Sequence, residues 1–175
     1  NIIDYLEPDE NKPGTWQLID MKAWGSYRVA KALGMVKVEG SKPARFVIDN
    51  TQADLWEQEL QLNRYRIMLE GRGAVISGMI IQAIVRDGDT YMAASRGITE
   101  KFYRIHVRKL PDSEVAQYFA GKYFMLTESL ANKMDAPICN DRECWNGKRC
   151  VDYCDVSRWC PKGAMEKMKQ GAQRR

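Results

Sequence analysis

The first residues of the chain form two short, apolar-rich runs that are typical of β-strands. Residues 2–6 form one short run and residues 16–22 a second, separated by a loop that contains prolines and glycine. In the second run Asp20 and Lys22 fall on the same face of the strand. We expect the two strands to pair in antiparallel fashion, which would bring Asp4 near Asp20.

Helical periodicity follows these strands. Residues 27–33 predict a short helix with Ser26 as its N-cap. The pattern Thr51-x-x-Asp54 resembles a capping box and predicts the start of the strongest helix of the chain, over residues 52–70. Its leucines recur on one stripe, so we expect that stripe to face the core.

The remaining elements are shorter, except for one further helix. Residues 35–49 predict a hairpin or an irregular excursion, 74–85 a buried strand, 91–93 a short strand and 103–108 an alternating strand. A helix should begin near Pro111 and run to about residue 133. This order predicts an α/β (α+β) core in which helices flank a central mixed sheet.

The positions of the cysteines indicate how the chain is divided into segments. All five lie between positions 139 and 160, in a loop-rich stretch. We therefore expect a core over residues 1–135, a cysteine-rich segment over 136–162 and a basic tail over 163–175. Such a cluster in a protein without signs of secretion favours metal binding over a disulfide framework.

Composition narrows the class of protein. The 175 residues are 45% hydrophobic and 29% charged, which is typical of a globular domain. No apolar run reaches the roughly 18 residues of a membrane span, and no leader is visible, so we expect a cytoplasmic protein. The net charge of +4 is compatible with a polyanionic partner. The chain starts inside a strand, which suggests part of a larger protein or complex, and its oligomeric state stays open.

The first candidate site combines two acids and a lysine. Asp4 and Asp20 offer hard carboxylate oxygens, and the backbone carbonyl of Met21 offers a third, a set that suits Mg²⁺ or Mn²⁺. Lys22 lies on the same strand face as Asp20 and could steady charge that develops on a phosphate. Most Asp-x-Lys patterns are solvated strand edges, but the apolar neighbours here indicate a buried strand.

The second candidate site lies on the long predicted helix. Gln61 and Tyr65 are four residues apart and so project from one face. Their amide and hydroxyl groups can make directional contacts to a phosphate. Arg64 and Arg66 flank them and are candidate DNA contacts. An ordinary amphipathic helix with a half-buried tyrosine explains the same pattern.

The cysteines form the third candidate site. Four thiolates suffice for Zn²⁺ or an iron–sulfur cluster, and we select Cys139, Cys150, Cys154 and Cys160, with Cys144 the weakest candidate. A metal there would hold a loop-rich segment on the core, because this segment has few apolar residues to bury. Aromatic and basic residues, including Lys148 and Arg149, interleave with the cysteines and are candidate DNA contacts. Packing of the aromatics around the metal is the competing explanation.

Taken in order, the stretches Ile2-Ile3-Asp4, Leu18-Ile19-Asp20-Met21-Lys22 and Gln61-Leu62-Asn63-Arg64-Tyr65 resemble the motifs of the PD-(D/E)XK nucleases. The resemblance is to their RecB-like and Cas4-like branch, which shows a G-x-x-D strand, a D-x-K strand and a Q-x3-Y helix. It covers about residues 1–70, and a phage or bacterial origin fits it. The family also has a helix and a strand before the first acid, often with a His or Glu ligand, and nothing in this chain corresponds to them.

The resemblance implies a restriction-endonuclease-like fold and a Mg²⁺-dependent nuclease acting on DNA ends or single strands. In that case Asp4 and Asp20 bind the metal, Lys22 is catalytic, and Gln61 and Tyr65 complete the site. The C-x3-C-x5-C spacing of the last three cysteines resembles the C-x2-C-x5-C end of relatives with a [4Fe–4S] cluster, and zinc is the alternative. The rival function is a non-catalytic DNA-binding or assembly module with a structural metal.

Overall fold

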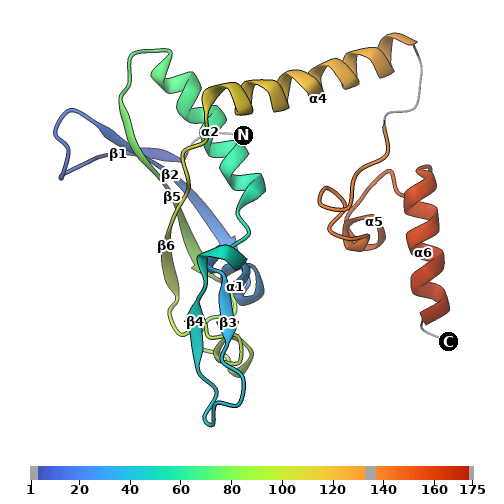
Figure 1. Ribbon diagram of the computed structural model, residues 1–175, viewed down its shortest axis with the longest axis horizontal. Coiled ribbons are helices and arrows are strands. Elements are labelled where there is room, and N and C mark those ends of the chain that lie inside the picture. Colours follow the sequence, from blue (N-terminus) through green and yellow to red (C-terminus); the bar gives the residue numbers. More distant parts are fainter. Residues whose placement is uncertain (1–3, 133–136, 174–175) are drawn as a thin grey trace. The chain divides into compact units, whose positions relative to one another are not determined.

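A computed structural model describes residues 4–132 and 137–173 (Figure 1). The chain divides into two units, residues 1–118 and 119–175, and each is treated by itself below. The N-terminal unit contains every strand among the described residues, and the C-terminal unit is helical with connecting turns.

The element bounds follow the chain order. The strands are β1 (Tyr5–Pro8), β2 (Trp16–Trp24), β3 (Met35–Lys37), β4 (Phe46–Ile48), β5 (Ile76–Val85) and β6 (Phe102–His106). The helices are α1 (Ser26–Leu33), a 3₁₀ turn η1 (Asn50–Gln52), α2 (Trp56–Glu70), α3 (Tyr91–Ala94), α4 (Asp112–Asn132), α5 (Lys148–Asp152) and α6 (Pro161–Gln173).

Four strands form a mixed sheet in the order β1-β2-β5-β6, and β3 and β4 form a separate hairpin (Figure 1). β1 pairs antiparallel with β2, as the sequence predicted. β2 runs parallel to β5 along its whole length, with Asp20 opposite Ile81 and Lys22 opposite Ala83. A parallel neighbour requires a long crossover, which α1, the hairpin and α2 supply here. The expectation of a mixed sheet flanked by helices is confirmed.

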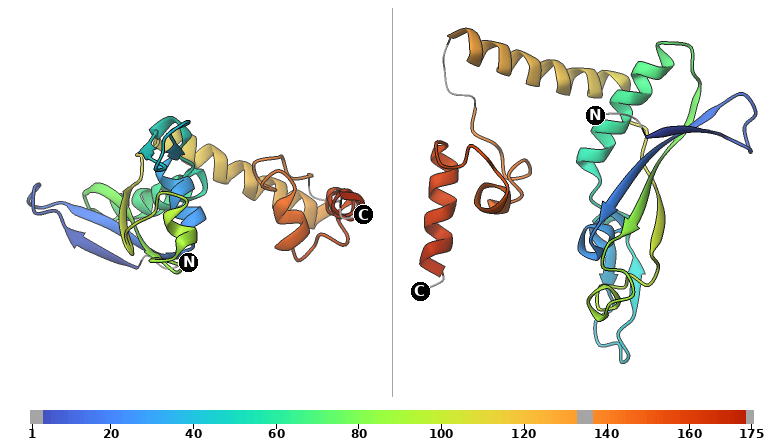
Figure 2. Two further views of the ribbon diagram at one scale, coloured as in Figure 1. Left: turned by 90° about the horizontal axis from the view of Figure 1, so that it is seen from below. Right: turned by 180° about the vertical axis from the view of Figure 1, so that it is seen from behind.

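One face of the sheet carries the main apolar core. Leu18 of β2 and Ile81 of β5 pack there with Val29 of α1, with Leu62 of α2 and with Leu55, the N-cap residue of α2. Leu69 and Tyr65 of α2 add to the same cluster. Figure 2 shows α2 running alongside the sheet in the N-terminal unit. The apolar stripe expected on this helix therefore does face the core.

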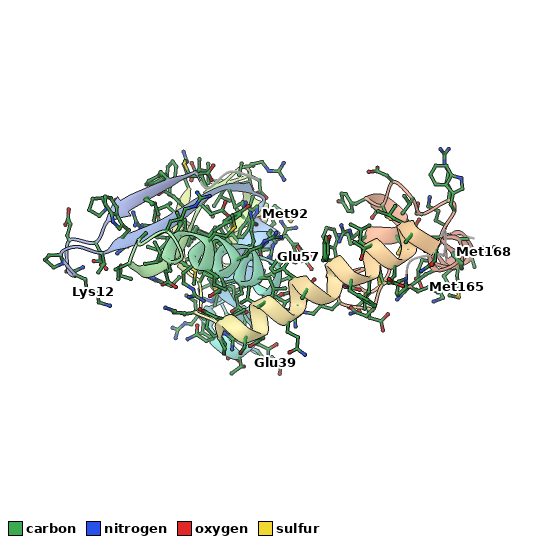
Figure 3. The ribbon with its side chains drawn as sticks, turned by 90° about the horizontal axis from the view of Figure 1, so that it is seen from above. Lys12, Glu39, Glu57, Met92, Met165 and Met168 are labelled. Carbon is green, nitrogen blue, oxygen red and sulfur yellow. The ribbon has the colours of Figure 1, made fainter. Side chains whose placement is uncertain are left out.

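The opposite face of the sheet is braced by polar side chains. The hydroxyl of Tyr5 on β1 donates to Gln82 Oε1 on β5 at 2.9 Å. Arg104 on β6 reaches across the sheet to the Glu7 carboxylate at 2.7 Å and to Gln17 at 3.3 Å. β1 is thus held by its ladder to β2 and by two side-chain links. The exposed loop between β1 and β2 carries Lys12 at its tip (Figure 3).

One predicted helix begins later than expected, and one predicted strand is a helix. The helix expected from residue 52 begins only at Trp56, because Asp49 caps the short η1 turn by accepting from the Thr51 N–H and the chain then extends at Ala53. The strand expected over residues 91–93 is instead α3, whose first turn is capped by the Thr90 side chain accepting from the Ala93 N–H. In both places a side-chain cap outweighs the local pattern.

Gly34 joins α1 to the β3–β4 hairpin at a point where a side chain has no room. It ends the helix with φ 67°, in the left-handed region. A Cβ atom there would lie 2.1 Å from the Asp49 carbonyl oxygen. Glycine is therefore required both by the backbone conformation and by the close approach of the chain that follows the hairpin.

Arg66 is a buried latch between α2 and the segment that follows β6. Its side chain is 1% exposed and pairs with Glu70 at 2.6 Å and with Asp112 at 2.5 Å. It also donates to the Leu110 carbonyl oxygen at 3.2 Å. Asn63, one turn earlier, accepts from the Leu110 N–H and donates to the Arg108 carbonyl oxygen. These bonds fix the start of α4 against α2.

The C-terminal unit has almost no apolar interior. Among its described residues the only hydrophobic side chains that are nearly fully buried are Cys144 and Cys150. Met165 and Met168 of α6 are exposed (Figure 3). α5 lies beside α6 in Figures 1 and 2, and a Cβ on Gly163 would lie 2.2 Å from the Ser157 carbonyl oxygen. The tail helix is therefore packed closely on the cysteine-rich segment.

Within the described residues no helix is long and apolar enough to cross a membrane.

We predict that Arg66→Ala lowers the free energy of unfolding by about 3 kcal/mol, because it removes the buried partner of two carboxylates, of the Asn63 amide oxygen and of the Leu110 carbonyl oxygen. Urea denaturation monitored by circular dichroism measures this change. Arg72→Ala on the exposed surface after α2 is the matched control and should change stability by no more than about 0.5 kcal/mol. An Arg66→Ala protein as stable as this control would refute the latch.

Candidate functional site

Asp20 is an acid placed in the middle of an apolar sheet. The residue is 3% exposed, and its strand neighbours on the same face are Leu18 and Lys22. Lys22 Nζ lies 3.0 Å from Asp20 Oδ1 in a hydrogen bond and 2.9 Å from Oδ2. The strand alternation that predicted a shared face for these two residues is thus matched by a direct ion pair.

One oxygen of this carboxylate lacks a hydrogen-bond donor. Asp20 Oδ2 is buried and, among the described residues, has no partner in hydrogen-bond geometry. Lys22 Nζ is close to it, but only the contact to Oδ1 has the angles of a hydrogen bond. Burial raises the pKa of Asp20 and the nearby Asp4 carboxylate raises it further, while Lys22 opposes both effects. A cation beside Oδ2 would satisfy it.

Asp4 lies near this carboxylate, as expected from antiparallel pairing of residues 2–6 with residues 16–22. Its Oδ2 accepts a hydrogen bond of 2.6 Å from the Met21 N–H. The antiparallel pairing ends with Tyr5 opposite Ile19, and Asp4 and Asp20 are the next residues beyond it. Asp4 is exposed whereas Asp20 is buried, so the pair offers one solvent-facing and one enclosed carboxylate. Two hard oxygen donors therefore meet at the end of β1.

Gln61 and Tyr65 lie on α2, the helix that packs on the sheet face carrying Asp20 and Lys22. The Gln61 amide nitrogen is 3.4 Å from the Tyr65 hydroxyl oxygen, so the two side chains do share one helix face. Tyr65 packs partly against the apolar core beside Leu62. The helix and the acid-x-lysine strand are thus neighbours in one layered arrangement.

Arg28 is a supporting residue that the sequence did not single out. Its guanidinium lies 4.8 Å from the ring centroid of Trp24, two residues beyond Lys22 on β2. It donates to the Asp54 carbonyl oxygen at 2.8 Å and also to Gln58 Oε1, one turn before Gln61. Arg28 therefore ties the strand that carries Lys22 to the helix that carries Gln61. No local pattern marks such a bond between distant residues.

The five thiols gather in the C-terminal unit. Burial raises the pKa of Cys150, and each of the other four cysteines raises it further by charge repulsion, which places all of them in its neighbourhood. All five are free thiols. Nevertheless, no group of three or more His, Cys, Asp or Glu side chains in the described ranges has the arrangement of a metal site.

Cys144 and Cys139 differ in their surroundings. Cys144 is 1% exposed, and the Gly147 N–H points at its Sγ from 3.3 Å. Cys139 is exposed. Amide hydrogen bonds to sulfur are typical of ligated thiolates. Burial therefore favours Cys144, the weakest candidate by sequence, over Cys139.

The four candidate DNA contacts are placed differently. Arg64, Lys148 and Arg149 are exposed. Arg66 was expected to contact DNA, but it is buried in the latch described above, so that prediction is wrong. The Arg66 guanidinium binds two carboxylates and one side-chain amide. The sequence alone did not distinguish it from Arg64, which is exposed on the same helix.

Comparisons with family models, with curated proteins and with solved structures found no match for this chain.

Asp87, in the loop after β5, stabilises the start of α1. Its carboxylate accepts from the Ser26 N–H at 2.6 Å and from the Ser26 hydroxyl at 2.7 Å, at the start of α1. Ser26 is thus the first residue of the helix rather than its N-cap, which is Gly25. Arg96 also donates to the Ser26 hydroxyl oxygen at 2.7 Å. The bonds from Ser26, aided by Arg96, lower the pKa of Asp87.

A lowered pKa means that Asp87 stabilises the fold when it is ionised. Its contribution is present above the ordinary aspartate pKa of about 4 and is lost as the pH falls through the lower folded pKa. We predict that Asp87→Asn lowers stability at pH 7, and that the difference from the unmodified protein shrinks below about pH 4. Urea unfolding from pH 3 to 7 measures it.

Asp89→Asn is the control for this change. The Asp89 carboxylate is 58% exposed and pairs with Lys101, which is equally exposed, so its loss should have little effect. A pH-independent difference between Asp87→Asn and the unmodified protein would contradict the assignment of the stabilisation to the ionised carboxylate.

Proposed function

We propose that the chain is the core of a metal-dependent deoxyribonuclease of the PD-(D/E)XK type that hydrolyses phosphodiester bonds. The observation that carries this proposal is the buried Asp20 carboxylate, with an oxygen that lacks a donor, the Asp4 carboxylate beside it and Lys22 paired to it. Burying such a carboxylate is costly unless a partner neutralises it. A catalytic cation is the partner that chemistry favours.

The donor set fits a hard divalent cation. Asp4 and Asp20 would hold it, with the Met21 carbonyl as the further oxygen proposed from the sequence. Bound Mg²⁺ or Mn²⁺ supplies neutralisation of phosphate charge and a lower pKa for an attacking water. With such a cation bound to Asp20, the Lys22 ammonium is free to donate to a phosphate oxygen on which charge develops.

The helix side chains have a positioning role in this proposal. Gln61 can donate its amide to a phosphate oxygen, and Tyr65 can hold that amide in place through its hydroxyl. Arg28 connects this helix to β2, because its guanidinium donates to Gln58 of α2 and lies over the Trp24 ring of β2. Arg64 is exposed on the same helix and can neutralise backbone phosphate.

The test is cleavage of end-labelled single-stranded DNA with and without Mg²⁺. We predict that Asp20→Asn and Lys22→Ala each lower the cleavage rate by about a hundredfold or more. Asp89→Asn and Lys101→Ala remove an exposed acid–lysine pair and serve as matched controls with unchanged rates.

Cleavage that persists in both site variants would show that the site is misassigned. A folded protein that binds DNA but does not cleave it with Mg²⁺ or Mn²⁺ would favour the rival function, a non-catalytic DNA-binding or assembly module.

We further propose that the C-terminal unit is built around a [4Fe–4S] cluster, with Zn²⁺ as the alternative. The support is the gathering of five thiols, two of them buried, in a unit with almost no apolar interior. Such a cluster supplies folding free energy that the unit cannot obtain from hydrophobic burial. Cys150, Cys154 and Cys160 would bind it, with Cys144 favoured over Cys139 as the fourth ligand.

This proposal predicts about four iron and four sulfide ions per chain after anaerobic purification. Cys144→Ser should lose most of the iron, whereas Cys139→Ser, its exposed counterpart, should retain it. Chelation of the metal should unfold the C-terminal unit and make it sensitive to protease. A colourless protein that contains zinc would exclude the iron–sulfur cluster, and one that contains neither metal yet stays folded would exclude both.

A further inference from the structure

Aromatic rings and arginines are stacked together on the C-terminal unit. The rings of Trp145 and Tyr153 meet edge to face with centroids 5.7 Å apart. The guanidinium of Arg149 lies 5.5 Å from the centroid of the Trp145 ring. Arg158 lies 3.7 Å from the centroid of the Trp159 ring and forms a second stack of the same kind. Rings and positive charge therefore occur in pairs.

These rings are exposed although the unit has few apolar side chains in its interior. Trp145 is 42% exposed, Tyr153 63% and Trp159 65%. The competing explanation from sequence was that these rings pack around the cysteines, and the exposure of all three rings does not favour it. Large rings left in water beside each other are typical of a binding surface.

The backbone that carries Trp145 is in an uncommon conformation. Trp145 and Asn146 both have φ 51°, and Gly147 has φ 89°, so three consecutive residues are left-handed. The Cβ of a residue other than glycine at position 147 would lie 2.5 Å from Glu166 of α6. Such a run costs conformational free energy and persists only when the surrounding structure enforces it. Its effect here is to hold Trp145 at the surface, at the start of α5.

The charges around the rings favour an anionic ligand. Two nearby acids are engaged with lysines, Glu143 with Lys122 and Asp141 with Lys162 at 2.9 Å, while Asp152 and Asp155 are exposed on either side of Tyr153. Arg149 and Arg158 lie over rings, where a guanidinium keeps N–H groups available at its edge, and one Arg149 N–H donates to the Glu143 carbonyl oxygen at 3.3 Å. A ring that stacks on a base beside a cation that meets a phosphate is the arrangement used for single-stranded nucleic acid.

We propose that Trp145, Tyr153 and Arg149 form a binding surface for single-stranded DNA, which we call the aromatic surface, with Trp159 and Arg158 as a second contact. In duplex DNA the bases are already stacked on one another, so only an unpaired strand can use these rings. The inference deepens the proposed nuclease function and rests on it for the choice of DNA as the polyanion. It names the form of DNA that the C-terminal unit would hold.

The test is fluorescence anisotropy of a labelled oligodeoxythymidine of about 16 nucleotides, in buffer without Mg²⁺ or Mn²⁺ under anaerobic conditions. Trp145→Ala should weaken binding about tenfold, and Trp145→Phe, which keeps a stacking ring, should bind within about threefold of the unmodified protein. Tyr91→Ala removes a ring that is 88% exposed in the other unit and is the matched control, with unchanged affinity. Blunt duplex DNA should bind Trp145→Ala and the unmodified protein equally.

Three results would overturn the inference: unchanged affinity in both Trp145→Ala and Tyr153→Ala, an equal loss for duplex and single strand, or tighter binding of the matching oligoribonucleotide. Should Trp145→Ala fail to fold by circular dichroism, a Tyr153→Ala, Trp159→Ala double variant replaces it. Because cleavage in the proposed nuclease requires added Mg²⁺ or Mn²⁺, this outcome is separate from that of the nuclease test. Asp20→Asn should retain full affinity for the oligonucleotide.

Discussion

The parallel pairing of β2 with β5 is the constraint on which the N-terminal unit depends. Its register sets Asp20 opposite Ile81 and Lys22 opposite Ala83, on the face where α2 packs. Because apolar side chains surround the carboxylate, its charge must be balanced locally, and Lys22 does this only in part. The same pairing requires a crossover, and that crossover contains the helix that carries Gln61 and Tyr65.

Short-range patterns predicted most of this unit. Alternation located β2 and β6, and it correctly placed Asp20 and Lys22 on one face. It failed where a side-chain cap decided the conformation, at Asp49 before η1 and at Thr90 before α3. Caps act over two or three residues and compete with weak periodicity, so a short segment can change from strand to helix through a single hydroxyl.

The sequence did not predict the side-chain hydrogen bonds that support the site. Arg28 meets Gln58 across 30 residues, and Ser26 meets Asp87 across 61. Arg66 illustrates the same limit, since its burial depends on Asp112, which lies 46 residues away. Residue type and spacing report which groups can bond, but only the tertiary fold brings distant partners together.

β1 is an edge strand of the sheet, paired on one side to β2, and it follows directly after Asp4. Edge strands open more readily than central ones, because fewer hydrogen bonds hold them. The links from Arg104 to Glu7 and from Tyr5 to Gln82 lie on the face opposite Asp20 and restrain that opening. In the proposed nuclease, the rate at which this strand opens would set how long a cation stays on Asp4 and Asp20, so residues remote from the carboxylates would tune its residence time.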